Sequence, residues 1–283
     1  MKNLKIKITA VVLLAFLSVF ATGAKKKAKV AESTYPKSIV ALSPSAAEIL
    51  FAVGAGDQVA AVSEFTDYPA EAAAKPVVGG FDGKTLSIET IMSFKPDLVY
   101  LTEGMHNFLI ATLESNGIAY YISKGESIAS VEQEILDVGK ITGHEKEAKK
   151  VVDDMEKKLK KATKKAVAPV KVYYEVWNAP YMSVGTTSFI HDVIVKAGGE
   201  NIFADLTDAY PMVSEETIIA REPEIILVPS SSGMEASAVG LRKGWADIPA
   251  VKNGKVFVVD DNVYTRPGPR IADVVLELSE KLK

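Results

Sequence analysis

The sequence has no cysteine and no excess of basic residues. Without cysteine the chain has no disulfide framework, no thiol nucleophile and no thiolate to offer a metal. A formal charge of −3 lacks the basic excess that binds a phosphate backbone, which excludes nucleic acid as a partner. The 283 residues do contain 48% hydrophobic and 24% charged residues, enough for a folded protein with two modest domains.

Motifs of catalysis are also absent. The segment GGFDG (79–83) lacks the GxGxxG spacing, and the chain has neither a P-loop nor a GxSxG elbow. His106, His144 and His191 are far apart and form no HExxH pair, so each is expected to be a surface or hydrogen-bonded residue. We therefore expect no enzyme, no metal site and no cofactor. The competing hypothesis is an exported α/β enzyme that acts on a metal chelate, such as a chelatase or esterase.

The N-terminus has the pattern of a signal peptide. Lys2, Lys5 and Lys7 precede an apolar run over residues 8–20, and small residues follow up to Ala24. The run of about 13 residues is shorter than the roughly 20 that a membrane-spanning helix needs. We predict export, with residues 1–24 as the leader.

Residues 25–35 are basic and then polar without periodicity, which is typical of a flexible tether. A lipoprotein signal would have cysteine where Ala24 stands. Two possibilities stay open: a lipoprotein whose anchor cysteine is replaced, and simple cleavage after Ala24. In either case the protein is expected in the periplasm or on the outer side of the cytoplasmic membrane.

From Tyr35 onward, short β-rich runs alternate with helical stretches, which predicts an α/β fold with parallel-rich sheets. Ser43 and Pro44 are placed as the N-cap and first residue of a helix. The predicted strands are 38–42, 57–62, 97–101 and 118–122 in a first lobe, and 170–176, 224–228 and 255–259 in a second.

A single long amphipathic helix is predicted from about Glu145 to Lys165, a stretch rich in strong helix formers with apolar residues at helical spacing. It divides the chain into an N-terminal lobe (36–143), a linking helix (144–167) and a C-terminal lobe (168–283). We expect this helix to be the only substantial connection between the lobes, and therefore little closure on ligand binding.

The two halves share a segment. SIETIMSFKPDLVYL (87–101) and SEETIIAREPEIILV (214–228) match at Ser, Glu, Thr, Ile and Pro with an offset of 127 positions. This duplication predicts two similar lobes related by a pseudo-twofold axis.

Aromatic residues recur in the predicted loops, beside glycine and proline. Such side chains give a large, flat or apolar ligand a wide contact area and have few rotatable bonds to immobilise. We expect them to line a cleft between the lobes. The loop aromatics are Phe65, Tyr68, Phe81, Trp177, Tyr181, Tyr210, Trp245 and Tyr264. We select Phe65, Phe81, Trp177, Tyr210 and Tyr264 as ligand-binding candidates.

The duplicated segment places one glutamate in the first turn of a helix in each lobe, Glu89 after Ser87 and Glu216 after Ser214. The helix dipole alone is a sufficient reason for an acid there. Their recurrence also suggests two carboxylates that pair with arginines of a symmetric partner.

Together these motifs resemble the periplasmic binding proteins of cobalamin, ferric siderophore and haem importers, in which one long helix joins two lobes. The resemblance rests on LSPSAAEILFAVGAG (42–56), TDYP (66–69), the SxExI(x)4P repeat, GGENIF (198–203) and RPGPRIAD (266–273). It implies a monomeric receptor that delivers a metal chelate to a dimeric membrane permease, with Glu89 and Glu216 docking on that permease.

Within this family the cobalamin-binding proteins are the most similar. The likeness implies that Phe65 and Phe81 face a corrin ring, with Tyr210 and Tyr264 beside them, and we place Arg266 in the same site. One departure is the loop after Leu101, where an expected tryptophan is absent.

Haem and siderophores stay as alternatives. Phe81 stands where haem-binding members often have a ligating tyrosine, although His106, Met105 and Tyr264 keep haem open. A catecholate siderophore would call for clustered arginines. The chain has four: Arg221, Arg242, Arg266 and Arg270.

Overall fold

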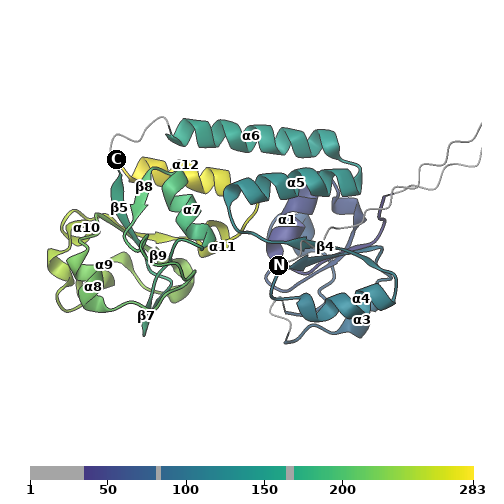
Figure 1. The fold of residues 1–283 in the computed structure, drawn as a ribbon, viewed down its shortest axis with the longest axis horizontal. Helices are drawn as coiled ribbons and strands as arrows, with labels where there is room; N and C mark the ends of the chain where they lie inside the picture. The colour runs from purple at the N-terminus through teal and green to yellow at the C-terminus, as the bar shows by residue number, and fades with distance from the viewer. Residues whose placement is uncertain (1–34, 81–83, 164–168) are drawn as a thin grey trace, which may run out of the picture. The chain divides into compact units, whose positions relative to one another are not determined.

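The computed structural model describes residues 35–80, 84–163 and 169–283. The predicted leader, the tether up to residue 34 and Phe81 lie outside the described residues. The rest folds into two lobes, each built on a four-stranded parallel sheet with helices around it (Figure 1). Within these ranges no helix is both long and apolar enough to cross a membrane.

The first lobe contains a parallel sheet in the order β2-β1-β3-β4, and its four strands match the four predicted ones. Ser43 caps the first helix by accepting a hydrogen bond from the Ala46 N–H, and Pro44 is its first residue, as predicted. The strands are β1 (Ile39–Ala41), β2 (Val59–Val62), β3 (Leu98–Thr102) and β4 (Ala119–Ser123). The helices are α1 (Pro44–Ala52), α2 (Ala70–Ala73), α3 (Ile88–Ser93), α4 (Ile110–Ser115) and α5 (Ile128–Thr142).

The second lobe has a parallel sheet in the order β10-β9-β5-β8 and a short antiparallel hairpin, β6-β7. The hairpin was not predicted because strands of two residues leave no readable alternation, and β8 was not predicted because its residues, Gly-Glu-Asn, are uncommon in strands. The strands are β5 (Val170–Tyr174), β6 (Trp177–Asn178), β7 (Tyr181–Met182), β8 (Gly199–Asn201), β9 (Ile225–Pro229) and β10 (Val256–Val259). The helices are α7 (Phe189–Lys196), α8 (Glu215–Ala220), α9 (Ala236–Gly240), α10 (Pro249–Lys252), α11 (Asp261–Tyr264) and α12 (Ile271–Lys281).

The two lobes have the same topology. Numbered along the chain within each lobe, both sheets have the strand order 2-1-3-4. The duplicated segment forms a helix and a central strand in each lobe, α3 with β3 and α8 with β9. Its likeness extends to the backbone, because Lys95 and Glu222, at equivalent positions, both have positive φ angles of 49° and 51°. The predicted internal duplication is confirmed.

Both sheets are buried on both faces, as parallel sheets usually are. Along β3, Leu98 and Tyr100 point to one hydrophobic cluster while Val99 and Leu101 point to another. The cluster that contains Leu98 and Tyr100 also contains β5 and β9 residues from the second sheet, together with residues of α1, α5, α7 and α12. The two lobes therefore share a continuous core.

The predicted long helix is α6 (Glu145–Thr163), which buries one apolar face against α5 and α12 (Figure 1). Residues 164–168, where the predicted helix was to end, lie outside the described residues. The expectation that this helix alone connects the lobes is wrong. Besides the shared core, the Asp192 carboxylate on α7 accepts a hydrogen bond of 2.7 Å from the Ile128 N–H at the start of α5.

Candidate functional site

The carboxyl ends of the strands are where a ligand is expected in each lobe. In an open parallel sheet, ligands bind outside the carboxyl ends of the strands, where neighbouring strands lead to connections on opposite sides. With a 2-1-3-4 order this point lies between β1 and β3 in the first sheet and between β5 and β9 in the second. Exposed aromatic side chains follow β2, β5 and β8, the strands at or beside these points.

Phe65 follows β2 and is 66% exposed. Its backbone has φ 61°, in the left-handed region that residues with a Cβ rarely adopt. The preceding residue is fixed, because the Glu64 N–H donates to the Gly79 carbonyl at 2.9 Å. The Phe65 ring is therefore presented at the sheet edge by a loop with a defined conformation.

Trp177 and Tyr210 occupy the corresponding edge of the second lobe, 56% and 51% exposed. Trp177 starts the hairpin that follows β5, and its indole N–H donates to the Ala179 carbonyl at 3.0 Å. Tyr210 lies in the connection after β8, which packs directly on Gly185: a Cβ at that glycine would meet the Asp208 carbonyl at 2.1 Å. Close backbone packing thus holds the Tyr210 loop in place.

Tyr264, another selected aromatic, does not join this exposed set. Tyr264 is only 3% exposed, and its hydroxyl donates to Glu277 at 3.2 Å, so it belongs to the core of the second lobe. Burial raises the pKa of the Tyr264 phenol. Phe81 lies outside the described residues. A sequence pattern of an aromatic residue after a strand cannot separate a core tyrosine from a surface one, which is why Tyr264 was selected.

Arg266 lies at the same edge but is already engaged. Its guanidinium donates to the Asp67 carboxylate, to the Phe65 carbonyl at 3.1 Å and to Asn262 at 2.9 Å. Burial opposes ionisation of Asp67, but the hydrogen bond and positive charge of Arg266 together hold the pKa of Asp67 below its ordinary value. Arg266 thus joins the second lobe to the loop that carries Phe65.

Met105 and Phe108, in the loop after β3, are exposed apolar residues. The sequence indicated Met105 only as a residue that kept haem open, and Phe108 was not among the predicted site residues. This loop is built around His106, which is fully buried and accepts the Thr102 N–H at Nδ1 over 2.9 Å. The Gly104 N–H is held by the Asn107 side chain at 3.1 Å. The signal in the sequence that could have identified these two residues is their position directly after the end of a strand and a glycine.

The residues that kept haem open offer few side chains that could ligate a haem iron. His106 is buried, and its Nδ1 accepts a hydrogen bond from a backbone N–H. The Tyr264 hydroxyl is hydrogen-bonded to Glu277. Of the three residues that kept haem open, only Met105 is exposed. Among the residues that the structure describes, no group of three or more His, Asp or Glu side chains is arranged to hold a metal ion.

Glu89 and Glu216 are exposed on the first turns of α3 and α8. The predicted N-caps are present, since Ser87 accepts the Thr90 N–H at 3.2 Å and Ser214 accepts the Thr217 N–H at 3.1 Å. The Ser87 hydroxyl donates to Glu89 and lowers the pKa of that carboxyl, and backbone hydrogen bonding lowers the pKa of Glu216.

The residues that precede Glu89 and Glu216 differ in chemistry, but both point their side chains into the protein. Ile88 packs against the hydrophobic core of the first lobe. Its equivalent, Glu215, accepts hydrogen bonds from the Tyr181 hydroxyl at 3.2 Å and from the Trp245 indole at 2.8 Å. Each helix is therefore fixed by one inward side chain and presents the next residue, Glu89 or Glu216, to solvent.

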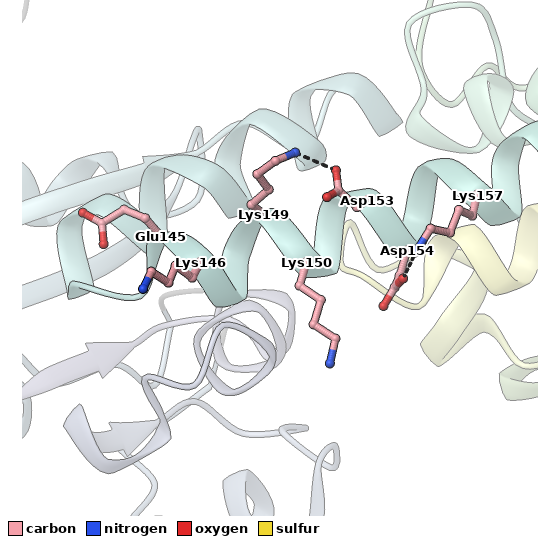
Figure 2. A pocket seen from close by; sticks show the side chains of 7 residues that line it. All are labelled: Glu145, Lys146, Lys149, Lys150, Asp153, Asp154 and Lys157. Carbon is pink, nitrogen blue, oxygen red and sulfur yellow. Dashed lines mark hydrogen bonds and ion pairs between the residues drawn. The ribbon is translucent and has the colours of Figure 1, made fainter.

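A hollow along the outer side of α6 is a poor site for such a ligand. Charged side chains line it, and several neutralise one another, with Lys149 to Asp153 and Lys157 to Asp154 both at 2.8 Å (Figure 2). It has no aromatic side chain. Its lining consists of Glu145, Lys146, Lys149, Lys150, Asp153, Asp154 and Lys157.

Two similar parallel-sheet lobes, a long helix across them and aromatic side chains at the strand ends define a solute-binding protein of the ABC importer type. The family model for periplasmic binding proteins matches residues 39–263, and the chain belongs to this family. The resemblance inferred from the sequence motifs is confirmed.

Individual relatives agree with this assignment. The chain is 33% identical over 257 residues to the uncharacterized ABC transporter substrate-binding lipoprotein YvrC of Bacillus subtilis (strain 168), covering 87% of this chain and 80% of that protein. It is 29% identical over 246 residues to the vitamin B12-binding protein of Vibrio parahaemolyticus, covering 86% and 88% of the two chains. The crystal structure of the periplasmic vitamin B12-binding protein of Vibrio cholerae superposes with a TM-score of 0.77 at 28% identity, covering 87% of this chain and 96% of that one.

Proposed function

We propose that this protein captures a corrinoid, cobalamin or a cobinamide, and delivers it unaltered to a membrane permease. The observation that carries the proposal is the set of exposed aromatic rings, Phe65, Trp177 and Tyr210, on defined loops at the strand ends of both lobes. Flat aromatic faces suit a broad, rigid macrocycle because they bury much area at little entropic cost. The vitamin B12-binding relatives support the same ligand class.

The arginines favour a corrinoid over an anionic catecholate siderophore. All four arginines of the chain already pair with carboxylates: Arg221 with Asp205, Arg242 with Glu175, Arg266 with Asp67 and Arg270 with Glu48. A chelate that needs forked guanidinium donors would have to break one of these pairs. A corrinoid with neutral amide side chains makes no such demand.

The test is calorimetric titration of the mature protein with cyanocobalamin, haemin and a ferric hydroxamate. We expect one-to-one binding of the corrinoid with a dissociation constant between nanomolar and micromolar, about 8 to 12 kcal/mol. The recovered ligand should be unaltered, whereas an enzyme would turn it over. Binding of haemin or the siderophore without any response to corrinoids would refute the proposal.

Tryptophan fluorescence adds a check on the site itself. Trp177 is exposed at the proposed site and Trp245 is fully buried in the core of the second lobe. Ligand quenching should therefore disappear largely in Trp177→Phe. If the variant is quenched as strongly as the unmodified protein, the ligand does not lie beside Trp177.

Export is part of the same proposal. The basic start, the apolar run over residues 8–20 and the small residues before Lys25 support a cleaved leader, and the lipoprotein relative supports a protein held at the membrane surface. Mass spectrometry of the protein from its native cell should find an N-terminus at or near residue 25. A mature protein that still carries residues 1–24 would contradict cleavage.

A further inference from the structure

The Phe65 loop has a conformation that its own residues do not favour. Phe65 has φ 61°, and side chains with a Cβ occupy that region rarely unless surrounding contacts hold them there. The ring is also largely exposed, so core packing contributes little to its position. Contacts to the backbone of the loop therefore help to hold it.

One such contact, from Glu64 to Gly79, lies within the first lobe, and the others come from the second lobe. Arg266 Nη2 donates to the Phe65 carbonyl at 3.1 Å and to Asn262 Oδ1 at 2.9 Å, while Nη1 donates to the Asp67 carboxylate. The arginine thus grips the loop on both sides of Thr66 from a position about 200 residues away in the chain. Asp67 stays ionised over the ordinary pH range because its pKa is lowered, which maintains the pair.

The segment behind Arg266 is itself anchored to the first lobe. Gly268 lies against Glu48, where a Cβ would come within 3.1 Å of Oε1. Arg270 donates to Glu48 and covers the Tyr68 ring, with its guanidinium carbon 4.0 Å from the ring centroid. Arg266 is therefore presented to the Phe65 loop by a fixed support.

We propose that Arg266 is a positioning residue that sets the orientation of Phe65 for the ligand, and that it affects affinity through this ring instead of through its own contact with the ligand. The proposal rests on the proposed function above. Three N–H groups of the Arg266 guanidinium are directed to Asp67, the Phe65 carbonyl and Asn262, and the Phe65 ring is the largely exposed group of this pair.

A double-mutant cycle with cyanocobalamin as the probe separates positioning from contact. Phe65→Ala and Arg266→Gln should each weaken binding, by about tenfold (1.4 kcal/mol). If Arg266 acts through Phe65, the double variant should be no weaker than about tenfold, because the ring that the arginine positions is already missing. Multiplication of the two effects to about a hundredfold would overturn the proposal.

A second readout needs no ligand. Amide hydrogen exchange of residues 63–69 should speed up in Arg266→Gln, and more weakly in Asp67→Asn, which serves if the arginine variant folds poorly. Arg221→Gln is the matched control, because it removes a comparable Arg–Asp pair, to Asp205, within the second lobe. Unchanged exchange in both Arg266→Gln and Asp67→Asn would show that the loop holds itself. Absence of cyanocobalamin binding in the unmodified protein would refute the proposed ligand. The hydrogen-exchange measurement would still test whether Arg266 holds the Phe65 loop.

Discussion

Arg270 Nε and Nη2 both donate to Glu48 Oε2, at 3.0 and 2.7 Å, and the Arg270 backbone N–H donates to Oε1 of the same carboxylate at 3.2 Å. The two residues are 222 positions apart. Glu48 is buried in α1 of the first lobe, whereas Arg270 immediately precedes α12. One ion pair therefore ties the end of the chain to the first helix.

Breaking this pair should be costly. Arg270→Ala leaves the Glu48 carboxylate buried without its partner, and removing one member of a buried pair costs about 3 to 5 kcal/mol of unfolding free energy. Urea denaturation measures it. Lys149→Ala is the control, since it removes an exposed pair with Asp153 on α6 and should cost far less. Equal losses in the two variants would show that the Glu48 pair carries no special weight.

Two buried tyrosines on central strands should respond oppositely to loss of their hydroxyls. The Tyr100 hydroxyl donates to Glu134, so Tyr100→Phe should lower the unfolding free energy by about 1 to 3 kcal/mol. The Tyr174 hydroxyl is buried and has no hydrogen-bond partner within the described part of the chain. Tyr174→Phe should therefore leave stability unchanged or raise it by up to about 1 kcal/mol. Chemical denaturation of the two variants measures these changes. A clear loss of unfolding free energy in Tyr174→Phe would reveal a partner for that hydroxyl.

Glu134 should make stability fall as the pH rises. Burial raises its pKa, against hydrogen bonds from Tyr100 and Ser123 that favour the charged form. A carboxyl with a higher pKa in the folded state binds its proton more tightly there, so its favourable contribution is complete at low pH. That contribution is lost as the pH passes upward from the unfolded pKa, about 4.3, through the folded one.

Glu134→Gln removes this titration. The unfolding free energy of the variant relative to the unmodified protein should therefore rise as the pH increases above the unfolded pKa of about 4.3, measured by urea denaturation at several pH values. Glu147→Gln, at an exposed position on α6, controls for loss of one negative charge. Parallel stability curves for Glu134→Gln and the unmodified protein would contradict the assigned pKa shift.

The two α/β lobes could be predicted from the sequence because the patterns that indicate them are local. The Ser43 and Pro44 start of α1, the strand runs and the duplicated SxE segment each depend on a few adjacent residues, and all appear in the structure. The hairpin β6-β7 was missed because its strands are too short to show a period, and β8 because Gly-Glu-Asn is not a strand-like sequence.

The site was harder to predict because its properties depend on residues far apart in the chain. Nothing adjacent to Tyr264 indicates that its hydroxyl is bonded to Glu277 inside the core. Nothing adjacent to Arg266 indicates that it pairs with Asp67, about 200 positions away. Loop aromatics could be listed from the sequence, but whether each one is buried is decided by tertiary packing.

Delivery to the permease should depend on Glu89 and Glu216 while ligand binding does not. Both acids are exposed on the first turns of equivalent helices, α3 and α8, one in each lobe. A permease with two similar subunits would meet matching carboxylates, and an arginine at that interface would lose its charge-assisted partner when an acid is removed. We expect the double variant Glu89→Ala, Glu216→Ala to bind cyanocobalamin normally by calorimetry but to fail to support its uptake in cells.

The matched control is Glu145→Ala with Glu147→Ala, because these exposed acids also lie in the first turn of a helix, α6, and their loss changes the net charge equally. A general effect of helix dipole or net charge should appear in both double variants. Docking should appear only in the first. If cells with Glu89→Ala, Glu216→Ala take up the corrinoid as well as those with the α6 control, the two acids are helix-terminal residues without a role in delivery. Loss of calorimetric binding in the first variant would instead place them at the ligand, against the geometry of α3 and α8.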